Sequence, residues 1–350
     1  MTTTGVAPRP TAAASALPSS EAVGAVMGTT AHLVALGDVD VARGIEELRG
    51  LEARWSRFIE TSELTRLGRL GGAPAVVSPH TALLIEMSER ARELTGGLFD
   101  ATLLDALESA GYDRTFELLQ PAADLDGGSA IGARLVPEEL PPVDPARRPS
   151  IEADPRTGLV RLPRGVRIDP GGIGKGLAAD LVAGWLLDHG ASGALVSVGG
   201  DLRVDGTPPA NGWEIELDHH VVTPARINLR SGAVATSTRL RRRWRTVDGT
   251  AHHLIDPRTG RPSNGPVVAV SVVAAEAWRA EAIATAVLIG HLTPGFDELA
   301  PALLAGAGAL ITTADRRRQR LGPLGESFLI PGDEHVPDLT TPIPAPEEQP

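Results

Sequence analysis

The segment of this sequence best suited to bind an anion is a glycine-rich turn that leads into a helix. Residues 168–176 read IDPGGIGKG, and apolar residues recur with helical spacing from Leu177 onward. Glycines leave room for a ligand to reach the backbone, and the first turn of a helix presents N–H groups that have no partner within the helix. Because Lys175 lies beside these groups, the turn suits a phosphate or a pyrophosphate. The alternative is a tight strand-to-helix turn in an ordinary α/β core.

The turn does not match the two common nucleotide-binding motifs. A P-loop would need a glycine in place of Asp169 and a hydroxyl side chain in place of Gly176 to bind magnesium. The dinucleotide-binding motif would need its third glycine where Leu177 stands. The rest of the chain must therefore decide which ligand the turn could hold.

Two histidines precede a predicted turn later in the chain. Residues 252–260 read HHLIDPRTG, in which Pro257 and Gly260 are typical of a turn. An imidazole with a pKa near neutrality could take a proton from a hydroxyl nucleophile there. The alternative for His252 and His253 is a pair of exposed side chains in a hairpin.

Glu281 and Thr285 lie four residues apart, a spacing that places both side chains on one face of a helix. Carboxylate and hydroxyl oxygens are hard ligands, which suit Mg²⁺ and not a soft metal. The alternative is that both residues belong to a solvated helix surface.

Residues 239–245 form a basic cluster in which Leu240 and Trp244 interrupt a run of arginines. In a strand, alternation would place Arg241, Arg243 and Arg245 on one face, which could meet phosphates or an acidic partner. A solvated strand face is the alternative.

Helices and strands distributed along the whole chain would position these residues. Apolar spacing predicts helices over 39–58 and 80–94, the latter with Ser78 and Pro79 at its start, and a helical piece that ends at Gly111. A further helix follows the glycine-rich turn, and another is predicted over 278–289. Strands are expected at 32–36, 151–153, 159–162, 166–168, 194–198, 213–217, 225–229, 233–236 and 266–274, with a short helix and a strand within 303–313.

Composition excludes several classes of protein. The 350 residues suffice for one large domain or two closely joined ones, and the absence of cysteine excludes disulfides, thiolate catalysis and zinc–thiolate sites. The net charge of -11 argues against nonspecific binding of nucleic acid, and no apolar run is long enough to span a membrane. The first 26 residues contain neither a continuous apolar segment nor a lipidation cysteine, so a cytoplasmic location is expected.

Several segments, taken in order, resemble the signature of the ApbE family, the FAD:protein FMN transferases. The segments DPGGIGKG, VSVGGD, ATS, HHLIDPRTGRP and AEAIAT are similar to the family pattern D-x-G-G-I-A-K-G, N-x-G-G-D, A-T-S-G, H-I-I-D-P-x-T-G and A-D-A-x-x-T. Near the N-terminus, MGTT at 27–30, SEL at 62–64 and GLFD at 97–100 are similar to further family segments. The resemblance runs from about Met27 to about residue 315.

The resemblance implies an α+β fold of the T-fold-like ApbE architecture, with mixed sheets and packed helices. We expect a disordered lead over 1–25 and an ApbE-like flavin transferase domain over 26–331, with a loop or insertion at 118–150. The proline- and glutamate-rich tail over 332–350 is expected to be disordered.

The resemblance also implies the chemistry. Enzymes of this family bind FAD, hold Mg²⁺ on its pyrophosphate, and transfer the FMN half to a threonine or serine hydroxyl of an acceptor protein, with release of AMP. His253 matches the family's histidine and would deprotonate the acceptor hydroxyl. The backbone carbonyl of Gly174 and the side chains of Glu281 and Thr285 match the Mg²⁺ ligands. The FAD site would be lined by Met27, Leu98, Phe99, Asp100, Gly171, Lys175, Leu177 and Ile255.

The sequence departs from the family pattern at several positions. Glu281 replaces an aspartate and adds a methylene, which changes the expected metal geometry or the affinity for Mg²⁺. Gly174 replaces an alanine but keeps the carbonyl group that would bind the metal. Leu177 replaces a frequent aromatic ring, and Thr238 replaces a glycine.

Two other functions are compatible with parts of the sequence. The change at Glu281 would permit a protein that binds FAD without transferring FMN. An arginine-rich nucleic-acid binder is disfavoured by the acidic net charge and by the lack of interleaved aromatic residues. Most family members are exported lipoproteins, whereas this chain shows no export signal, so an intracellular acceptor, or the cytoplasmic side of one, is expected.

Overall fold

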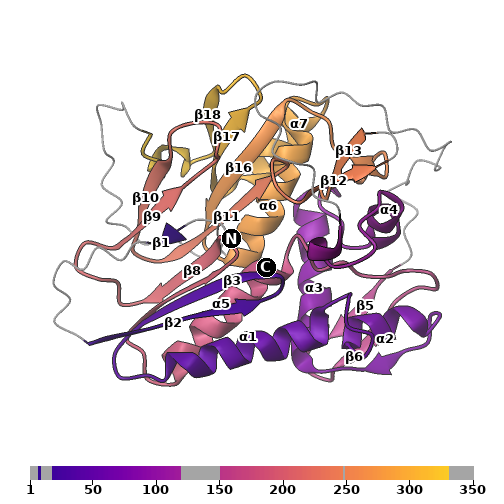
Figure 1. Ribbon diagram of the computed structural model, residues 1–350, viewed down its shortest axis with the longest axis horizontal. Coiled ribbons are helices and arrows are strands. Elements are labelled where there is room, and N and C mark those ends of the chain that lie inside the picture. The colour runs from indigo at the N-terminus through magenta and orange to yellow at the C-terminus, as the bar shows by residue number, and fades with distance from the viewer. Residues whose placement is uncertain (1–6, 9–17, 120–149, 247–248, 331–350) are drawn as a thin grey trace.

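An eight-stranded antiparallel sheet forms the centre of the fold (Figure 1). The computed structural model describes residues 7–8, 18–119, 150–246 and 249–330. The strand order is β18–β17–β16–β11–β8–β7–β3–β2, and each neighbouring pair runs antiparallel. The strands are β2 Ser19–Val26, β3 Thr29–Leu36, β7 Gly193–Val198, β8 Asp201–Gly206, β11 Gly232–Thr238, β16 Val267–Ala274, β17 Gly308–Thr313 and β18 Arg318–Leu321.

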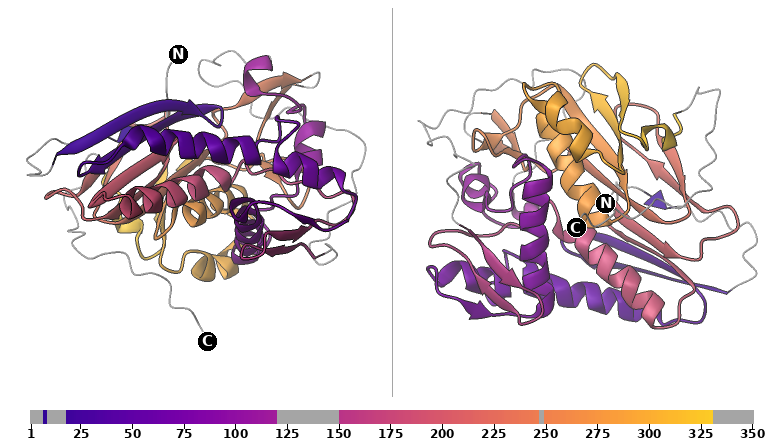
Figure 2. Two further views of the ribbon diagram at one scale, coloured as in Figure 1. Left: turned by 90° about the horizontal axis from the view of Figure 1, so that it is seen from below. Right: turned by 180° about the vertical axis from the view of Figure 1, so that it is seen from behind.

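Three helices pack along this sheet, as the two views of Figure 2 show. They are α1 Val41–Trp55, α5 Gly174–Asp188 and α6 Ala277–Gly290. α1 contacts β2 and β3, α5 contacts β7 and β8, and α6 contacts β11 and β16. Nearly the whole circumference of α6 is buried, because it lies between the sheet and other helices.

A smaller sheet covers part of the opposite face of the large one. It has the order β1–β9–β10 and consists of β1 Ala7–Pro8, β9 Trp213–Leu217 and β10 Ala225–Leu229. Apolar side chains of β9 and β10 pack against alternate residues of the large sheet. Every residue of β16 is buried, as expected for a strand covered on both faces.

A second group of helices lies beside the large sheet. It contains α2 Glu63–Arg69, α3 Pro79–Leu94 and α4 Leu104–Ser109, with a small sheet of β4 Ala75–Val76, β6 Leu159–Arg161 and β5 Glu152–Asp154. The Ser78 hydroxyl accepts a hydrogen bond from the Thr81 N–H at 3.3 Å, which confirms the predicted start of the helix over 80–94.

Two hairpins follow β11 and connect the large sheet to α4. They are β12 Arg243–Thr246 with β13 Gly249–His252, and β14 Ile255–Asp256 with β15 Arg261–Pro262. Trp244 is buried, and its Nε1 donates to the carbonyl of Ala110 at 2.8 Å, just after α4. The remaining elements are α7 Phe296–Leu303 and the 3₁₀ turns η1 Phe116–Leu118 and η3 Gly325–Ser327.

The predicted α+β class is confirmed, but three local expectations were wrong. Residues 19–25 lie in the expected disordered lead, yet they form most of β2, which pairs with β3 along its full length and packs on α1. Residues 166–168 are not a strand, because the chain turns there and the Val166 N–H bonds to the Pro163 carbonyl. Arg241 precedes β12 instead of lying within it, because Arg242 has a positive φ of 46°.

Other expectations about the chain ends and the loop lie outside the described residues. These are the lead over 1–6 and 9–17, most of the loop over 118–150, and the tail over 332–350. Within the described part of the chain, no helix combines the length and the apolar character needed to cross a bilayer.

Candidate active site

The glycine-rich turn lies between β6 and α5 and approaches two other segments closely. A Cβ on Gly172 would lie 2.9 Å from the ring of Phe99 and 3.7 Å from Oγ1 of Thr285. Only glycine fits at position 172 without a shift of the neighbouring ring. The structure therefore brings the turn, the segment around residue 99 and α6 to one place, although the sequence separates them widely.

A buried cluster of charges lies at the start of α5. Lys175 Nζ donates to Asp201 Oδ2 at 2.6 Å and also forms a short hydrogen bond with Glu281 Oε1. The other oxygen of Glu281 accepts from the Gly176 N–H at 2.8 Å. Asp201 Oδ1 accepts from the Thr236 N–H at 3.1 Å. Two carboxylates from β8 and α6 therefore converge on one ammonium group from α5.

This arrangement changes two interpretations made from the sequence. Glu281 is only 3% exposed, so it does not belong to a solvated helix surface. Its carboxylate also uses the Gly176 N–H, one of the groups in the first turn of α5 that we expected to face an anion. Part of the predicted anion site is therefore already satisfied by the protein.

The protonation of this cluster follows from its burial. Burial, together with the nearby charge of Asp201, raises the pKa of Glu281 to about 8, against the opposing effect of Lys175. Burial alone would lower the pKa of Lys175, but Asp201 and Glu281 raise it overall. Lys175 is therefore an ammonium ion at neutral pH. Glu281 gains a proton when the pH falls below about 8.

Glu281 and Thr285 are held in place by contacts of α6 with its neighbours. The N–H groups of Ala277 and Trp278, at the start of α6, both donate to the carboxylate of Asp180 at 2.9 Å. Thr285 Oγ1 lies 3.0 Å from the hydroxyl of Ser237, which belongs to the ATS segment on β11. These contacts fix the position of α6 relative to α5 and to the sheet.

The two histidines have different surroundings. His252 Nε2 lies 2.8 Å from the carbonyl of Ser263, and its Nδ1 lies 3.3 Å from the N–H of Leu254. His252 is thus a structural residue inside its hairpin, although it is buried and not exposed as the alternative assumed.

His253 is influenced by the charge of Lys175. Burial lowers its pKa well below the usual value, and the charges of Arg242 and Lys175 act in the same direction. The side chain is therefore neutral at pH 7, which is the state required of a proton acceptor. The charge of Lys175 therefore acts on the histidine segment.

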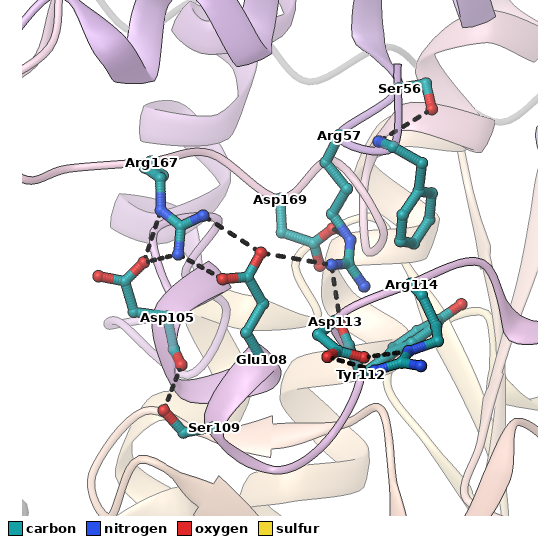
Figure 3. Close-up of polar contacts among 11 residues, drawn as sticks. Ser56, Arg57, Asp105, Glu108, Ser109, Tyr112, Asp113, Arg114, Arg167 and Asp169 are labelled. Atoms are coloured by element: carbon teal, nitrogen blue, oxygen red, sulfur yellow. Dashed lines mark hydrogen bonds and ion pairs between the residues drawn. The ribbon is translucent and has the colours of Figure 1, made fainter. Parts of the chain in front are cut away.

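A group of residues around Arg57 was missed by the sequence analysis (Figure 3). Arg57 Nε lies 3.3 Å from Asp169 Oδ1, and Arg57 Nη1 donates to the carbonyl of Tyr112 at 2.9 Å. Its guanidinium carbon lies 4.2 and 4.5 Å from the ring centres of Phe58 and Tyr112. Arg167 forms ion pairs with Asp105 and Glu108 in the same view. These contacts attach the start of the glycine-rich turn to the second group of helices.

The remaining predicted FAD-site residues have varied positions. Met27 forms the tight turn between β2 and β3 and has a φ of 51°. Asp100 Oδ1 accepts from the Thr102 N–H at 2.8 Å. Leu98, Leu177 and Ile255 are buried in three separate apolar clusters.

The oxygen donors near Lys175 fit a hard cation in their chemistry. Glu281, Thr285 and a backbone carbonyl at Gly174 are the kind of ligands that Mg²⁺ takes. In the part of the chain that the structure describes, no group of three or more His, Cys, Asp or Glu side chains could hold a metal. A metal here would therefore depend on hydroxyl and carbonyl oxygens, and it would share Glu281 with Lys175.

Comparisons with known proteins identify relatives of this chain. A sequence model of the ApbE family matches residues 27–303. An FAD:protein FMN transferase of Vibrio cholerae is 27% identical over 288 residues, which cover 76% of this chain and 80% of that protein. One of Salmonella typhimurium is 27% identical over 281 residues, which cover 76% and 77%.

Solved structures show the same fold. The ApbE protein of Thermotoga maritima superposes with a TM-score of 0.70 at 25% identity, and the match covers 87% of this chain and 97% of that one. The flavin transferase ApbE of Vibrio cholerae gives a TM-score of 0.68 at 22% identity, with 89% and 100% covered. The family model matches most of the chain, and the fold is that of a solved ApbE protein. The chain therefore belongs to the ApbE family.

Proposed function

We propose that this protein transfers the FMN half of FAD to a threonine or serine hydroxyl of an acceptor protein and releases AMP, in a reaction that requires Mg²⁺. The observation that carries the proposal is the contact of the glycine-rich turn with α6, in which Lys175 bonds to Glu281 and Gly172 lies against Thr285. The charge of Lys175 also acts on His253, which supports a place for this histidine beside the same site. Family membership supports the same chemistry, because relatives of this chain are named FAD:protein FMN transferases.

The reaction makes one bond and breaks another at phosphorus. The acceptor oxygen attacks the phosphorus of the FMN half, the bond from that phosphorus to the bridging oxygen of the pyrophosphate breaks, and AMP leaves. The proton of the hydroxyl goes to the neutral imidazole of His253. Burial holds the pKa of His253 low, and the charges of Arg242 and Lys175 lower it further. An anionic substrate that offsets these charges would remove the second contribution and raise the pKa toward the range useful to a base.

Other residues of the cluster would bind and orient the substrate. Lys175 and the backbone of the turn would contact the pyrophosphate, and Met27, Phe99, Asp100, Gly171 and the other predicted residues would line the FAD site. Glu281, Thr285 and the carbonyl of Gly174 would hold Mg²⁺, which when bound neutralises charge on the phosphoryl oxygens.

The test uses FAD, Mg²⁺ and a threonine-containing FMN-acceptor domain. The native protein should increase the mass of the acceptor by one FMN and release one AMP for each acceptor labelled. His253→Ala should abolish labelling but leave FAD binding within about twofold, because the imidazole acts on the hydroxyl and not on FAD. His80→Ala is the matched control, since His80 is exposed at the start of α3 and should label normally. Labelling by His253→Ala at the native rate would remove His253 from this role.

A second function is favoured by one specific observation. The carboxylate of Glu281 already bonds to Lys175 and to the Gly176 N–H, so it is not free to bind a metal without rearrangement. If the native protein binds FAD tightly but forms neither labelled acceptor nor AMP at saturating Mg²⁺, then it is an FAD-binding protein without transferase activity.

A further inference from the structure

Arg239 carries two buried donors for which the described part of the chain offers no partner. The residue follows β11 and is only 4% exposed, and its backbone N–H donates to the carbonyl of Val268 at 3.1 Å. The Nε and Nη1 atoms of its guanidinium are buried and have no hydrogen-bond partner among the described residues. Burying such groups without an acceptor is unfavourable, because the lost hydration is not replaced.

The hydroxyl of Ser263, just after β15, is a second buried group without a partner among the described residues. Arg243 on β12 stands opposite His252 on β13. Burial lowers the pKa of His252 to about 4, and the charges of Arg239 and Arg243 act in the same direction. His252 contacts the carbonyl of Ser263, and the hydroxyl of Ser263 is buried without a partner in the described part of the chain. Arg243 and Ser263 therefore flank a histidine that stays neutral, and the charge of Arg239 acts on the same histidine.

Positive charges gather in the Arg239 cluster, which consists of Arg239, Arg243, His252 and Ser263. Burial lowers the pKa of Arg239, and the nearby charge of Arg243 lowers it further. Arg245 lies on the same side of the hairpin as Arg243 and is exposed, so the cluster extends to the surface. A concentration of positive charge with unused N–H and O–H groups suits an anion.

The cluster lies on the opposite side of the hairpin from the residues that face α4. Trp244 and Ala251 form the pair next to Arg243 and His252, so their side chains point to the other face, where they pack against Tyr112. The carbonyl of Tyr112 binds Arg57, whose guanidinium lies beside Asp169. The Arg239 cluster is therefore separated by the hairpin from the part of the active site at Asp169.

We propose that Arg239, Arg243 and Ser263 form an oxyanion-binding site that takes a carboxylate or a phosphoryl group. A guanidinium offers a planar set of N–H donors that matches two oxygens of such a group, and the Ser263 hydroxyl supplies a further donor. The site does not depend on flavin transfer, so it can be tested in the FAD-free protein.

The experiment measures thermal unfolding of the full chain in chloride, in inorganic phosphate and in acetate at equal ionic strength. An anion present at about 100 times its Kd should raise the Tm of the native protein by about 5 °C. Arg239→Met should remove this shift and, in chloride, should have a Tm at least equal to that of the native protein, because the buried donors without partners are gone. Stabilisation by phosphate alone identifies a phosphoryl ligand, and stabilisation by acetate as well identifies a carboxylate-type site.

Two controls separate this site from a general effect of salt on the protein. Arg226→Met removes an exposed arginine that pairs with Glu214, and it should keep the anion-dependent shift. Ser263→Ala should reduce the shift without removing it, and it provides a test if Arg239→Met does not fold. The proposal is overturned if neither anion stabilises the native protein beyond chloride, or if Arg239→Met keeps the full shift. It is also overturned if Arg239→Met loses the stabilisation by FAD, since the guanidinium would then belong to the FAD site.

Discussion

Replacing Lys175 by methionine tests the charge cluster most directly. Methionine keeps most of the length of the side chain but removes the ammonium group that donates to Asp201 and Glu281. Both carboxylates are about 3% exposed, so water cannot take over the role of the ammonium. Two charge-assisted hydrogen bonds contribute about 1.5–3 kcal/mol each, and removing one partner of a buried ion pair costs about 3–5 kcal/mol. We therefore expect Lys175→Met to lower the free energy of unfolding by about 3–5 kcal/mol.

The free energy of unfolding that Lys175→Met removes should grow with pH above about 8. A carboxyl group whose folded pKa lies above its unfolded pKa makes the protein less stable as pH rises, until the pH reaches the folded pKa. In the native protein this loss ends near pH 8, the pKa of Glu281. Without Lys175 the pKa of Glu281 rises further, so the loss continues. One pH unit corresponds to about 1.4 kcal/mol. The destabilisation caused by Lys175→Met should therefore be larger at pH 9 than at pH 6.5 by about this amount.

Urea unfolding of the native protein and of Lys175→Met at pH 6.5 and at pH 9 measures both effects. The double variant Lys175→Met/Glu281→Gln is the control, since it cannot ionise at position 281 and its cost should not increase with pH. The assigned role of Lys175 is refuted if Lys175→Met costs less than about 1 kcal/mol at pH 9, or if its cost is the same at both pH values.

Two further predictions concern the packing of α5 against α6 and the binding of Mg²⁺. A Cβ on Gly176 would lie 2.4 Å from the carbonyl oxygen of Ala277, so Gly176→Ala should destabilise the protein by about 1–3 kcal/mol in urea unfolding. Gly184→Ala on the same helix, where a Cβ meets no atom within 4 Å, should instead stabilise it by about 0.5–1 kcal/mol, and equal effects at both positions would contradict a close contact between α5 and α6. Because a proton on Glu281 competes with a metal and its pKa is about 8, calorimetric affinity for Mg²⁺ should rise about tenfold per pH unit from pH 6 to pH 8 and then level off. Glu281→Gln should remove this dependence, and an unchanged pH profile would exclude Glu281 from the metal site.

Local patterns were sufficient to predict most of the secondary structure. The helix over 80–94 and its serine cap depend on neighbouring residues alone, and the structure confirms them in α3. The buried strand over 266–274 was also predicted from its continuous apolar run, which matches β16. By contrast, β2 was missed, because an edge strand with few large apolar residues is stabilised by pairing with β3, and this pairing leaves little trace in its own sequence.

The candidate site shows the same division. Ordered motifs in the sequence identified the glycine-rich turn, the histidine pair and the residues at 281 and 285, together with the ApbE family. They did not show that Glu281 is buried, although an acidic residue in a largely apolar helix is a signal for burial. The interpretation of the four-residue spacing as a solvated surface hid this signal. Arg57 carried no such signal, since its role beside Asp169 arises from contact across the fold.

Residue types and their order along the chain were enough to establish the family and the kinds of groups in the site. Which of those groups touch, and therefore which are charged, was settled only by the tertiary structure. The physical reason is that the pKa of Glu281 and the pairing of Lys175 depend on burial and on distances of a few ångströms, and these are set by the packing of α5 and α6 on the sheet.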